Sequence, residues 1–181
     1  ISVVDIQKNQ KIADIKTGNK PHDSADPPDG KWVAVSNEGD NSVSIISTAN
    51  NTVTQTVSVG KVPHQLSFSR DGKYILTAIN AEHKVDVIST TDWKLVNSIP
   101  VGRNPHIVLP MPDGKNVWVT SEGDNKIVKI NLDEMKVTSE ISTFGFPRVM
   151  TTTPDGKFIY LTLRWFHGLV KIDTEQNKII A

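Results

Sequence analysis

The sequence predicts an all-β protein in which one four-stranded antiparallel sheet is repeated along the chain. A Pro-His pair at residues 21–22 recurs at 63–64 and 105–106, and Pro-Arg stands at 147–148. An Asp-Gly-Lys turn recurs with the same spacing, at residues 29–31, 71–73, 113–115 and 155–157. Each step is 42 residues without insertion. Short segments rich in β-branched residues alternate with turn signals, and no segment keeps a helical period over a comparable length.

A β-propeller explains a repeat of this length. Four short strands in 42 residues match one propeller blade, which typically takes about 40–50 residues. A single sheet cannot bury both of its faces, whereas sheets stacked around a common axis bury them against one another. The constant register argues against the alternatives, a β-sandwich and an open β-solenoid.

The predicted elements follow in order. Residues 1–18 hold two strands, Ile1–Ile6 and Lys11–Lys16, which we assign to a preceding blade. The blade at 19–60 has strands at 22–25, 31–36, 42–47 and 52–59, and its first turn is Pro-Pro-Asp-Gly, whose proline and glycine suit a tight turn. The blades at 61–102, 103–144 and 145–181 repeat this plan, with later strands at 74–78, 84–89, 94–101, 116–120, 126–131, 136–142, 158–162, 169–173 and 178–181. The outer strand of the last blade is incomplete.

The blade count predicts an incomplete ring. Propellers typically have four to eight blades, and a closed four-bladed ring would leave the two N-terminal strands over. We therefore expect part of a seven- or eight-bladed ring, which remaining blades or another chain complete. The start at Ile1, with neither Met nor a signal peptide, is what we expect of a processed or excised piece.

Composition excludes several classes of function. Twenty Lys and Arg residues balance twenty Asp and Glu residues, so no global field favours nucleic acid, and we expect no nucleic-acid partner. The chain has no cysteine, which excludes disulfides, thiolate metal sites and covalent haem attachment within it. No apolar run is long enough to span a bilayer. Catalytic motifs such as Gly-x-Ser-x-Gly are absent, and the serines and threonines are the polar alternates of strands.

The repeat resembles the YVTN-type propeller repeat. Residues 60–64 and 71–73 are similar to its Gly-x-x-Pro-x opening and its Asp-Gly-Lys turn, and residues 34–37, 118–121 and 160–163 are similar to its Tyr-Val-Thr-Asn tetrad. The resemblance implies a bacterial or archaeal protein in the periplasm or outside the cell, and often a scaffold. Related propellers include lactonase-like enzymes and the haem-binding domains of dissimilatory nitrite reductases.

Equivalent positions in the four blades differ in three places, which we take as candidate site residues. The position after the proline holds His22, His64, His106 and Arg148. The position that opens the turn after the second strand holds Glu38, Asn80, Glu122 and Arg164, and three residues later stand Asn41, His83, Asn125 and His167. The turn into the first strand and the turn from the second to the third strand lie at the same end of a sheet. The three positions should therefore share one face at the mouth of the channel, and the Asp-Gly-Lys turns should lie on the opposite face.

The chemistry of these residues leaves several interpretations open. Imidazoles that converge with carboxylates can bind a transition metal, through His22, His64 and His106, or contact a haem or polarise a substrate. The alternative is structural, with the histidines capping the strand. In the last blade, Arg148, Arg164, Trp165 and His167 suit an anionic or planar ligand. The alternative there is packing against a neighbouring domain or subunit.

The function predicted first is a propeller scaffold that binds a small ligand or a protein partner on this face. The predicted site residues are His22, Glu38, His64, His83, His106, Glu122, Arg148, Arg164, Trp165 and His167. One alternative is a redox, metal- or haem-dependent enzyme domain that uses histidines from several blades. Another is a lactonase-like hydrolase. Whether the protein is an enzyme stays open at the level of sequence.

Overall fold

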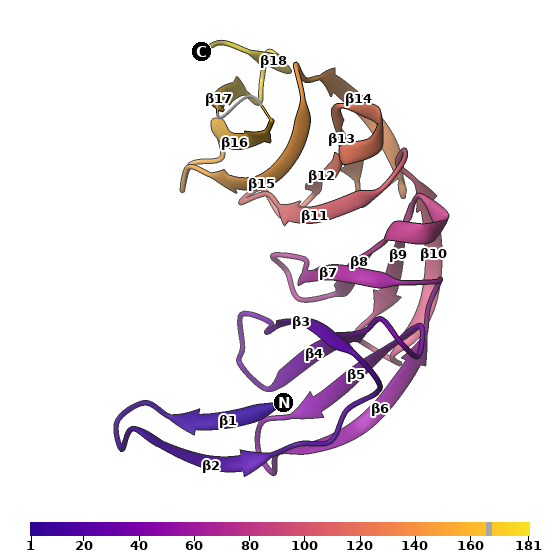
Figure 1. Ribbon diagram of the computed structural model, residues 1–181, viewed down its shortest axis with the longest axis vertical. Coiled ribbons are helices and arrows are strands. Elements are labelled where there is room, and N and C mark those ends of the chain that lie inside the picture. The colour runs from indigo at the N-terminus through magenta and orange to yellow at the C-terminus, as the bar shows by residue number, and fades with distance from the viewer. Residues whose placement is uncertain (166–167) are drawn as a thin grey trace.

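The computed structural model describes residues 1–165 and 168–181, which form five antiparallel sheets (Figure 1). The first sheet is the hairpin of β1 (Ser2–Asp5) and β2 (Gln10–Asp14). The first blade consists of β3 (Pro21–Ala25), β4 (Trp32–Asn37), β5 (Ser42–Ser47) and β6 (Thr52–Ser58). The second blade consists of β7 (Pro63–Phe68), β8 (Tyr74–Ile79), β9 (Lys84–Ser89) and β10 (Lys94–Pro100). The third consists of β11 (Pro105–Pro110), β12 (Asn116–Ser121), β13 (Lys126–Asn131) and β14 (Lys136–Ser142), and the fourth of β15 (Phe146–Thr152), β16 (Phe158–Arg164), β17 (Gly168–Asp173) and β18 (Lys178–Ile179).

The blades fan out along an arc. In each of them the strands are paired in chain order, and the first strands β3, β7, β11 and β15 are neighbours from blade to blade. The hairpin β1–β2 and the fourth blade lie at the two ends of the arc, which do not meet (Figure 1). The prediction of an all-β, partial propeller of four-stranded blades is confirmed.

The Asp-Gly-Lys turns close the first two strands of each blade. In the second blade, Asp71 Oδ1 accepts a hydrogen bond from the Lys73 N–H at 3.1 Å, and Gly72 has a φ of 72°. Thr90 donates to the Gly72 carbonyl at 2.7 Å and so ties this turn to the turn between β9 and β10. Glycine adopts a positive φ without a Cβ clash. The conformation and hydrogen bonds of the turn thus account for its residues, which belong to the framework of the blade.

Each first strand contains a β-bulge immediately after its proline. In the second blade Pro63 pairs with Ile79 and Leu66 pairs with Thr77, so three steps on β7 match two steps on β8. The same shift follows the prolines of β3, β11 and β15. A bulge inserts one residue and re-aims the side chains beside it. The side chains of the residues after the prolines therefore do not follow the regular alternation between the two faces of the sheet.

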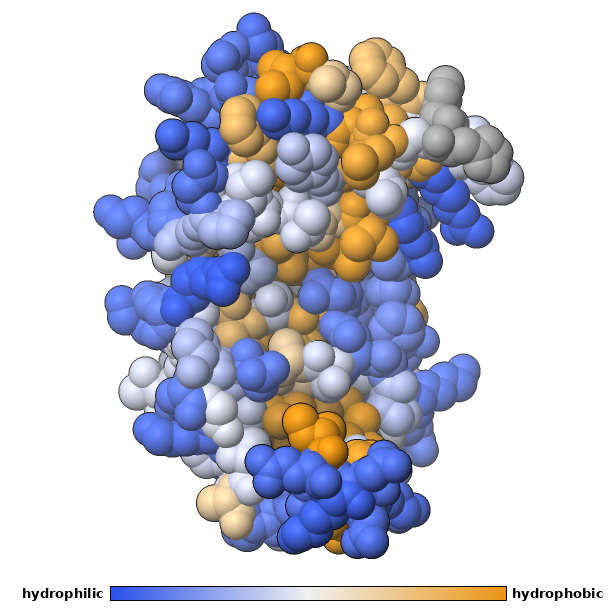
Figure 2. All heavy atoms as spheres, turned by 90° about the vertical axis from the view of Figure 1, so that its left-hand side faces the viewer, coloured by the Kyte–Doolittle hydropathy of each residue, from blue (hydrophilic) through white to orange (hydrophobic). Residues whose placement is uncertain are grey.

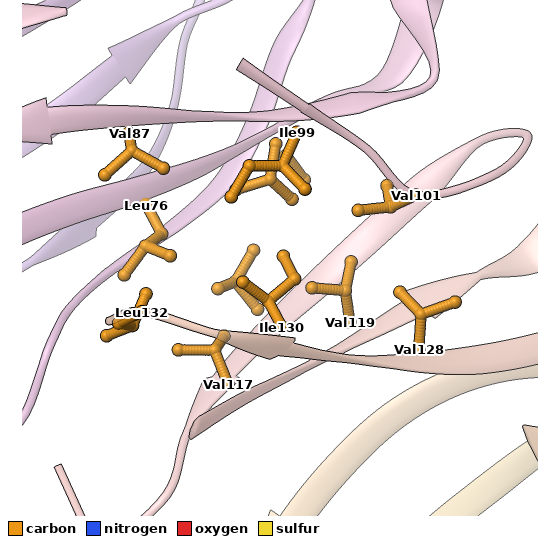
Figure 3. Close-up of a cluster of buried hydrophobic side chains, with 12 residues drawn as sticks. Leu76, Val87, Ile99, Val101, Val117, Val119, Val128, Ile130 and Leu132 are labelled. Atoms are coloured by element: carbon orange, nitrogen blue, oxygen red, sulfur yellow. The ribbon is translucent and has the colours of Figure 1, made fainter. Parts of the chain in front are cut away.

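The core lies between blades. The cluster in Figure 3 joins the second and third blades, with buried residues from both facing sheets. Its members include Leu76, Ala78, Val85, Val87, Ile99, Val101, Val108, Val117, Val119, Val128, Ile130 and Leu132. A second cluster around the buried Trp118 joins the third and fourth blades. Burying each such side chain contributes about 1.5–3 kcal/mol relative to leaving it in water. Blade-to-blade packing thus holds the arc together.

The two ends of the arc expose apolar side chains. Val149 and Leu169 on the fourth blade are 51% and 61% exposed, and Ile6 and Ile12 on the hairpin are 89% and 56% exposed. Figure 2 views the open side of the arc and shows hydrophobic side chains along its middle, with hydrophilic ones on both flanks. Among the described residues, no helix is long and apolar enough to cross a membrane.

Candidate functional site

The residues after the blade prolines are held together by the neighbouring first strands. Asp23 Oδ2 accepts a hydrogen bond from the Leu66 N–H at 3.2 Å, and Gln65 Oε1 accepts one from the Val108 N–H at 2.7 Å. Each bond joins the bulge of one blade to the first strand of the next. The strands β3, β7 and β11 are therefore fixed side by side, with their bulges at the same end.

Three imidazoles stack at this end. The ring centroids of His22 and His64 are 3.8 Å apart, and those of His64 and His106 are 4.3 Å apart, with tilted planes in both pairs. Burial increases along the stack, because the side chain of His22 is 37% exposed and that of His64 18%. His106 is buried. Nδ1 of His64 and both ring nitrogens of His106 are buried and have no hydrogen-bond partner among residues 1–165 and 168–181.

The two inner imidazoles are neutral at pH 7. Burial lowers the pKa of His106 from its ordinary 6.5 to about 3, and the charges of His64 and Arg148 act in the same direction. The pKa of His64 is lowered as well, first by burial and then by His22, and Glu38 only partly opposes this. A neutral imidazole keeps a lone pair on one ring nitrogen, so it can accept a hydrogen bond or bind a metal ion.

Two carboxylates come from the turns between the second and third strands, and one of them, Glu38, reaches the stack. Glu38 Oε1 lies 3.7 Å from His22 Nε2 and 4.0 Å from His64 Nε2. Glu122 Oε1 forms an ion pair with Arg148 Nη1 at 2.8 Å. We call this group the histidine site, and its members are His22, Glu38, His64, His106, Glu122 and Arg148.

Two further residues that the sequence predicts, His83 and His167, are not members of this group. His83 is exposed, has a φ of 60°, and its Nδ1 lies 3.2 Å from the Asn80 carbonyl oxygen. Its counterparts Asn41 and Asn125 have a φ of 51°. Asn and His are enriched in this left-handed conformation. The side chains of Asn41 and His83 also accept hydrogen bonds from the N–H groups of Val62 and Asn104 in the next blade, at 3.0 and 3.4 Å, so a structural role explains these residue types. His167 lies outside the described residues.

The fourth blade adds an exposed aromatic and cationic group. Trp165 is 69% exposed, with the Arg164 guanidinium 5.5 Å from its ring centroid and the Phe146 ring 6.3 Å away. Arg164 is close enough to contribute to the lowered pKa of His106. Phe146 pairs with Arg164 and lies two residues before Arg148, so the group adjoins the fourth-blade end of the histidine site, where it places an indole ring beside a guanidinium.

Sequence reasoning overlooked the hydroxyl groups that support the bulges. Ser36, Thr120 and Thr162 accept hydrogen bonds from the N–H groups of Asp23, Ile107 and Val149, at 3.1, 2.9 and 3.1 Å. These hydroxyls are more than polar strand alternates, since they satisfy a backbone donor that the bulge removes from the ladder. The sequence does contain a signal for this role, because three of the four blades have a hydroxyl residue at the same position.

Comparisons with known proteins agree on the fold. A family model described as YNCE-like β-propeller matches residues 1–112. No curated protein sequence matches the chain. Similar solved structures include Kuenenia stuttgartiensis hydrazine synthase, with a TM-score of 0.87, 24% identity and 94% of this chain covered. Dihydro-haem d1 dehydrogenase NirN in complex with DHE has a TM-score of 0.84, 18% identity and 99% of this chain covered.

A functionally unknown protein from Desulfotomaculum acetoxidans DSM 771 is also similar, with a TM-score of 0.83, 15% identity and 94% of this chain covered. The chain spans 50%, 40% and 57% of the three solved chains. The resemblance to a YVTN-type repeat holds at the level of the β-propeller. Because the matching family model covers more than half of the sequence, the chain belongs to the YNCE-like β-propeller family.

Proposed function

We propose that this propeller is a scaffold that binds a small ligand at the histidine site. The observation that carries the proposal is the set of unpartnered buried nitrogens on His64 and His106. Buried polar atoms in proteins are nearly always hydrogen-bonded, and leaving one unpaired costs about 1–3 kcal/mol. A ligand with hydrogen-bonding groups would satisfy these nitrogens.

The charges around the site favour an anionic or planar ligand. Arg148 contributes a guanidinium that is 38% exposed and holds Glu122 with one nitrogen. Arg164 and Trp165 extend the same side with a second guanidinium and a stacking surface. Arginine binds carboxylates and phosphates through its planar fork, and the indole ring packs on flat molecules.

A redox or haem-dependent role is the second candidate. The observation in its favour is the stack of imidazoles with lowered pKa values, because neutral imidazole is a common ligand of iron and copper. NirN, whose solved structure is in complex with DHE, has the same fold, and at 18% identity this likeness supports the fold alone. The periplasmic or extracellular location expected from the repeat stays a prediction.

Ligand-dependent stabilisation tests the proposal. Metal-free protein is screened by thermal unfolding against dicarboxylates, phosphate esters and haem, beside the variants His106→Phe and His83→Asn. A ligand at 100 times its Kd stabilises the native state by about 2.7 kcal/mol, a rise in Tm of roughly 5–10 °C for a chain of this size. We expect at least one compound to stabilise wild type and His83→Asn but not His106→Phe.

The control is chosen to keep the fold. His106→Phe keeps an aromatic ring in the stack, slightly larger than imidazole, and removes both ring nitrogens, and His83→Asn introduces the residue found at the same position in the first and third blades. Equal responses of wild type and His106→Phe to every compound would contradict the proposal. For the second candidate, a visible spectrum and metal analysis of protein from its native source must show a chromophore or a transition metal.

A further inference from the structure

The histidine site contains the same geometric position three times, once between each pair of neighbouring blades. Each position is formed by the residue after the proline in two adjacent blades and by the turn residue of the first blade of the pair. Between the first and second blades these residues are His22, His64 and Glu38. Between the second and third they are His64, His106 and Asn80, and between the third and fourth they are His106, Arg148 and Glu122.

The third position shows what such a carboxylate requires. There the Arg148 guanidinium lies 2.8 Å from Glu122, which is 13% exposed, so the chain itself supplies a cation for a nearly buried carboxylate. At the first position the equivalent carboxylate, Glu38, is 26% exposed and faces two imidazoles. A carboxylate removed from water requires a compensating positive charge or several hydrogen bonds. Glu38 therefore has two imidazoles where its counterpart Glu122 has a guanidinium.

The distances at the first position suit a bound ion better than direct hydrogen bonds. Glu38 Oε1 is 3.7 and 4.0 Å from the two imidazole nitrogens, beyond hydrogen-bond length. One donor atom from each of the three residues lies within 4.8 Å of the others. Around a tetrahedral ion with bonds of about 2.0–2.1 Å, donor atoms are about 3.4 Å apart. The two distances of 3.7 and 4.0 Å are close to that separation.

We propose that His22, His64 and Glu38 bind one divalent transition-metal ion between the first and second blades. Two imidazoles and one carboxylate match the donors that Zn²⁺ and Co²⁺ take, whereas Mg²⁺ and Ca²⁺ take oxygen donors alone. Three protein ligands leave a coordination position for water or for an anionic group of a ligand. The inference deepens the proposed ligand-binding role. Metal binding itself does not rest on that role, whereas the binding of a ligand's anionic group at the open coordination position does.

Two neighbouring positions explain why one ion is expected. Between the second and third blades the carboxylate is replaced by Asn80, whose amide nitrogen donates to the Pro105 carbonyl at 3.3 Å. Between the third and fourth blades Arg148 occupies the place of the second imidazole, and its charge repels a metal ion. Nδ1 of His64 and both nitrogens of His106 remain for an organic ligand.

The test titrates EDTA-treated protein with Zn²⁺ by calorimetry and with Co²⁺ by visible absorption. Wild type should bind one equivalent of Zn²⁺, and Co²⁺ should give the absorption bands of a low-symmetry site. Glu38→Gln and His22→Ala should each weaken Zn²⁺ binding at least tenfold, in keeping with the loss of one of three ligands. His83→Asn, which removes an exposed imidazole outside the site, should bind like wild type.

A gain of binding provides a second arm. Arg148→His places an imidazole beside His106 and Glu122 and so recreates the donor set of the first position. We expect the stoichiometry to rise from one to two equivalents of Zn²⁺. Thermal unfolding in EDTA should show that Glu38→Gln is folded, since the amide has the same shape as the carboxylate.

The outcomes separate this inference from the proposed function. Absence of saturable one-equivalent binding to wild type, or equal binding to wild type and Glu38→Gln, overturns the metal site. If metal-free protein still responds to an organic ligand through His106, the proposed function survives that result. If Zn²⁺ binds through Glu38 and no organic ligand binds through His106, the metal site stands and the proposed function fails.

Discussion

At the scale of single residues, the backbone next to the histidine site is strained at one position. Val62, immediately before Pro63, has a φ of 57°, in the left-handed region that a β-branched residue rarely adopts. Its counterparts Lys20 and Asn104 have φ values of 50° and 51°. Val62 donates its N–H to Asn41 Oδ1 of the preceding blade at 3.0 Å, which helps to hold the conformation. The strain lies two residues before His64.

Val62→Asn should therefore stabilise the protein. The left-handed conformation costs an ordinary residue about 1–2 kcal/mol, and asparagine tolerates it best after glycine. We expect a gain of about 1 kcal/mol, a rise in Tm of roughly 2–4 °C. The reverse change at the equivalent position, Asn104→Val, should lower Tm by a similar amount. A lower Tm for Val62→Asn would show that the valine side chain contributes packing that outweighs the strain.

His106 should make the protein sensitive to acid. Its pKa is about 3 in the folded state against an ordinary 6.5, so below pH 6.5 the unfolded chain binds a proton that the folded chain does not. Stability is then fully present above pH 6.5 and declines as the pH falls towards about 3. Urea unfolding in EDTA across this range should show a smaller decline for His106→Phe than for wild type. Parallel curves for the two proteins would contradict the role of His106.

At the scale of elements, the bulges decide where the site residues point. Thr120 is buried and accepts the Ile107 N–H at the bulge of β11, next to His106. Thr77 is also buried, but its hydroxyl has no hydrogen-bond partner in the part of the chain that the structure describes, and it occupies the position of Val35 and Val119 in the neighbouring blades. Two buried threonines on equivalent strands therefore have opposite energetic roles.

The same substitution at these threonines should change stability in opposite directions. Thr120→Val removes the acceptor of a buried N–H and should destabilise the protein by about 1–3 kcal/mol. Thr77→Val removes an unpaired hydroxyl without changing shape and should be neutral or stabilising by about 1 kcal/mol. Chemical denaturation measures both. If both variants lose equal stability, the loss reflects packing rather than the bulge hydrogen bond.

The sequence predicted the elements better than their register. Asp-Gly-Lys marks each tight turn because its glycine adopts positive φ, so the turns could be read directly from single residues. The bulge after each proline has no such residue, because it depends on a shift between paired strands, and a hydroxyl from the neighbouring strand supports it in only three of the four blades. The stack of His22 and His64 joins residues 42 positions apart. The repeat predicted that they share a face, but their contact depends on the spacing of whole blades.

At the scale of the whole molecule, each blade is stabilised by the faces that its neighbours cover. The first three blades are covered on both faces: the first by the hairpin and the second blade, the second by the first and third blades, and the third by the second and fourth blades. The hairpin β1–β2 and the fourth blade are covered on one face and expose apolar side chains on the other. In a repeat protein of this kind, stability is approximately a sum of unit and nearest-neighbour terms. The middle of the arc should therefore be its most stable part.

Hydrogen exchange measured by mass spectrometry should report this gradient. Amides in β8, β9, β12 and β13, which lie in the two blades farthest from the ends of the arc, should exchange slowest. Amides in β1, β2, β17 and β18 should exchange faster, because opening an end unit exposes one interface rather than two. The histidine site spans all four blades, so the exchange rates of the amides at its two ends should differ as well. His22, His64 and His106 lie in blades that are covered on both faces, whereas Arg148 lies in the fourth blade, which is covered on one face. Equal protection in all units would mean that the arc opens as one cooperative body, and nearest-neighbour packing would not explain its stability.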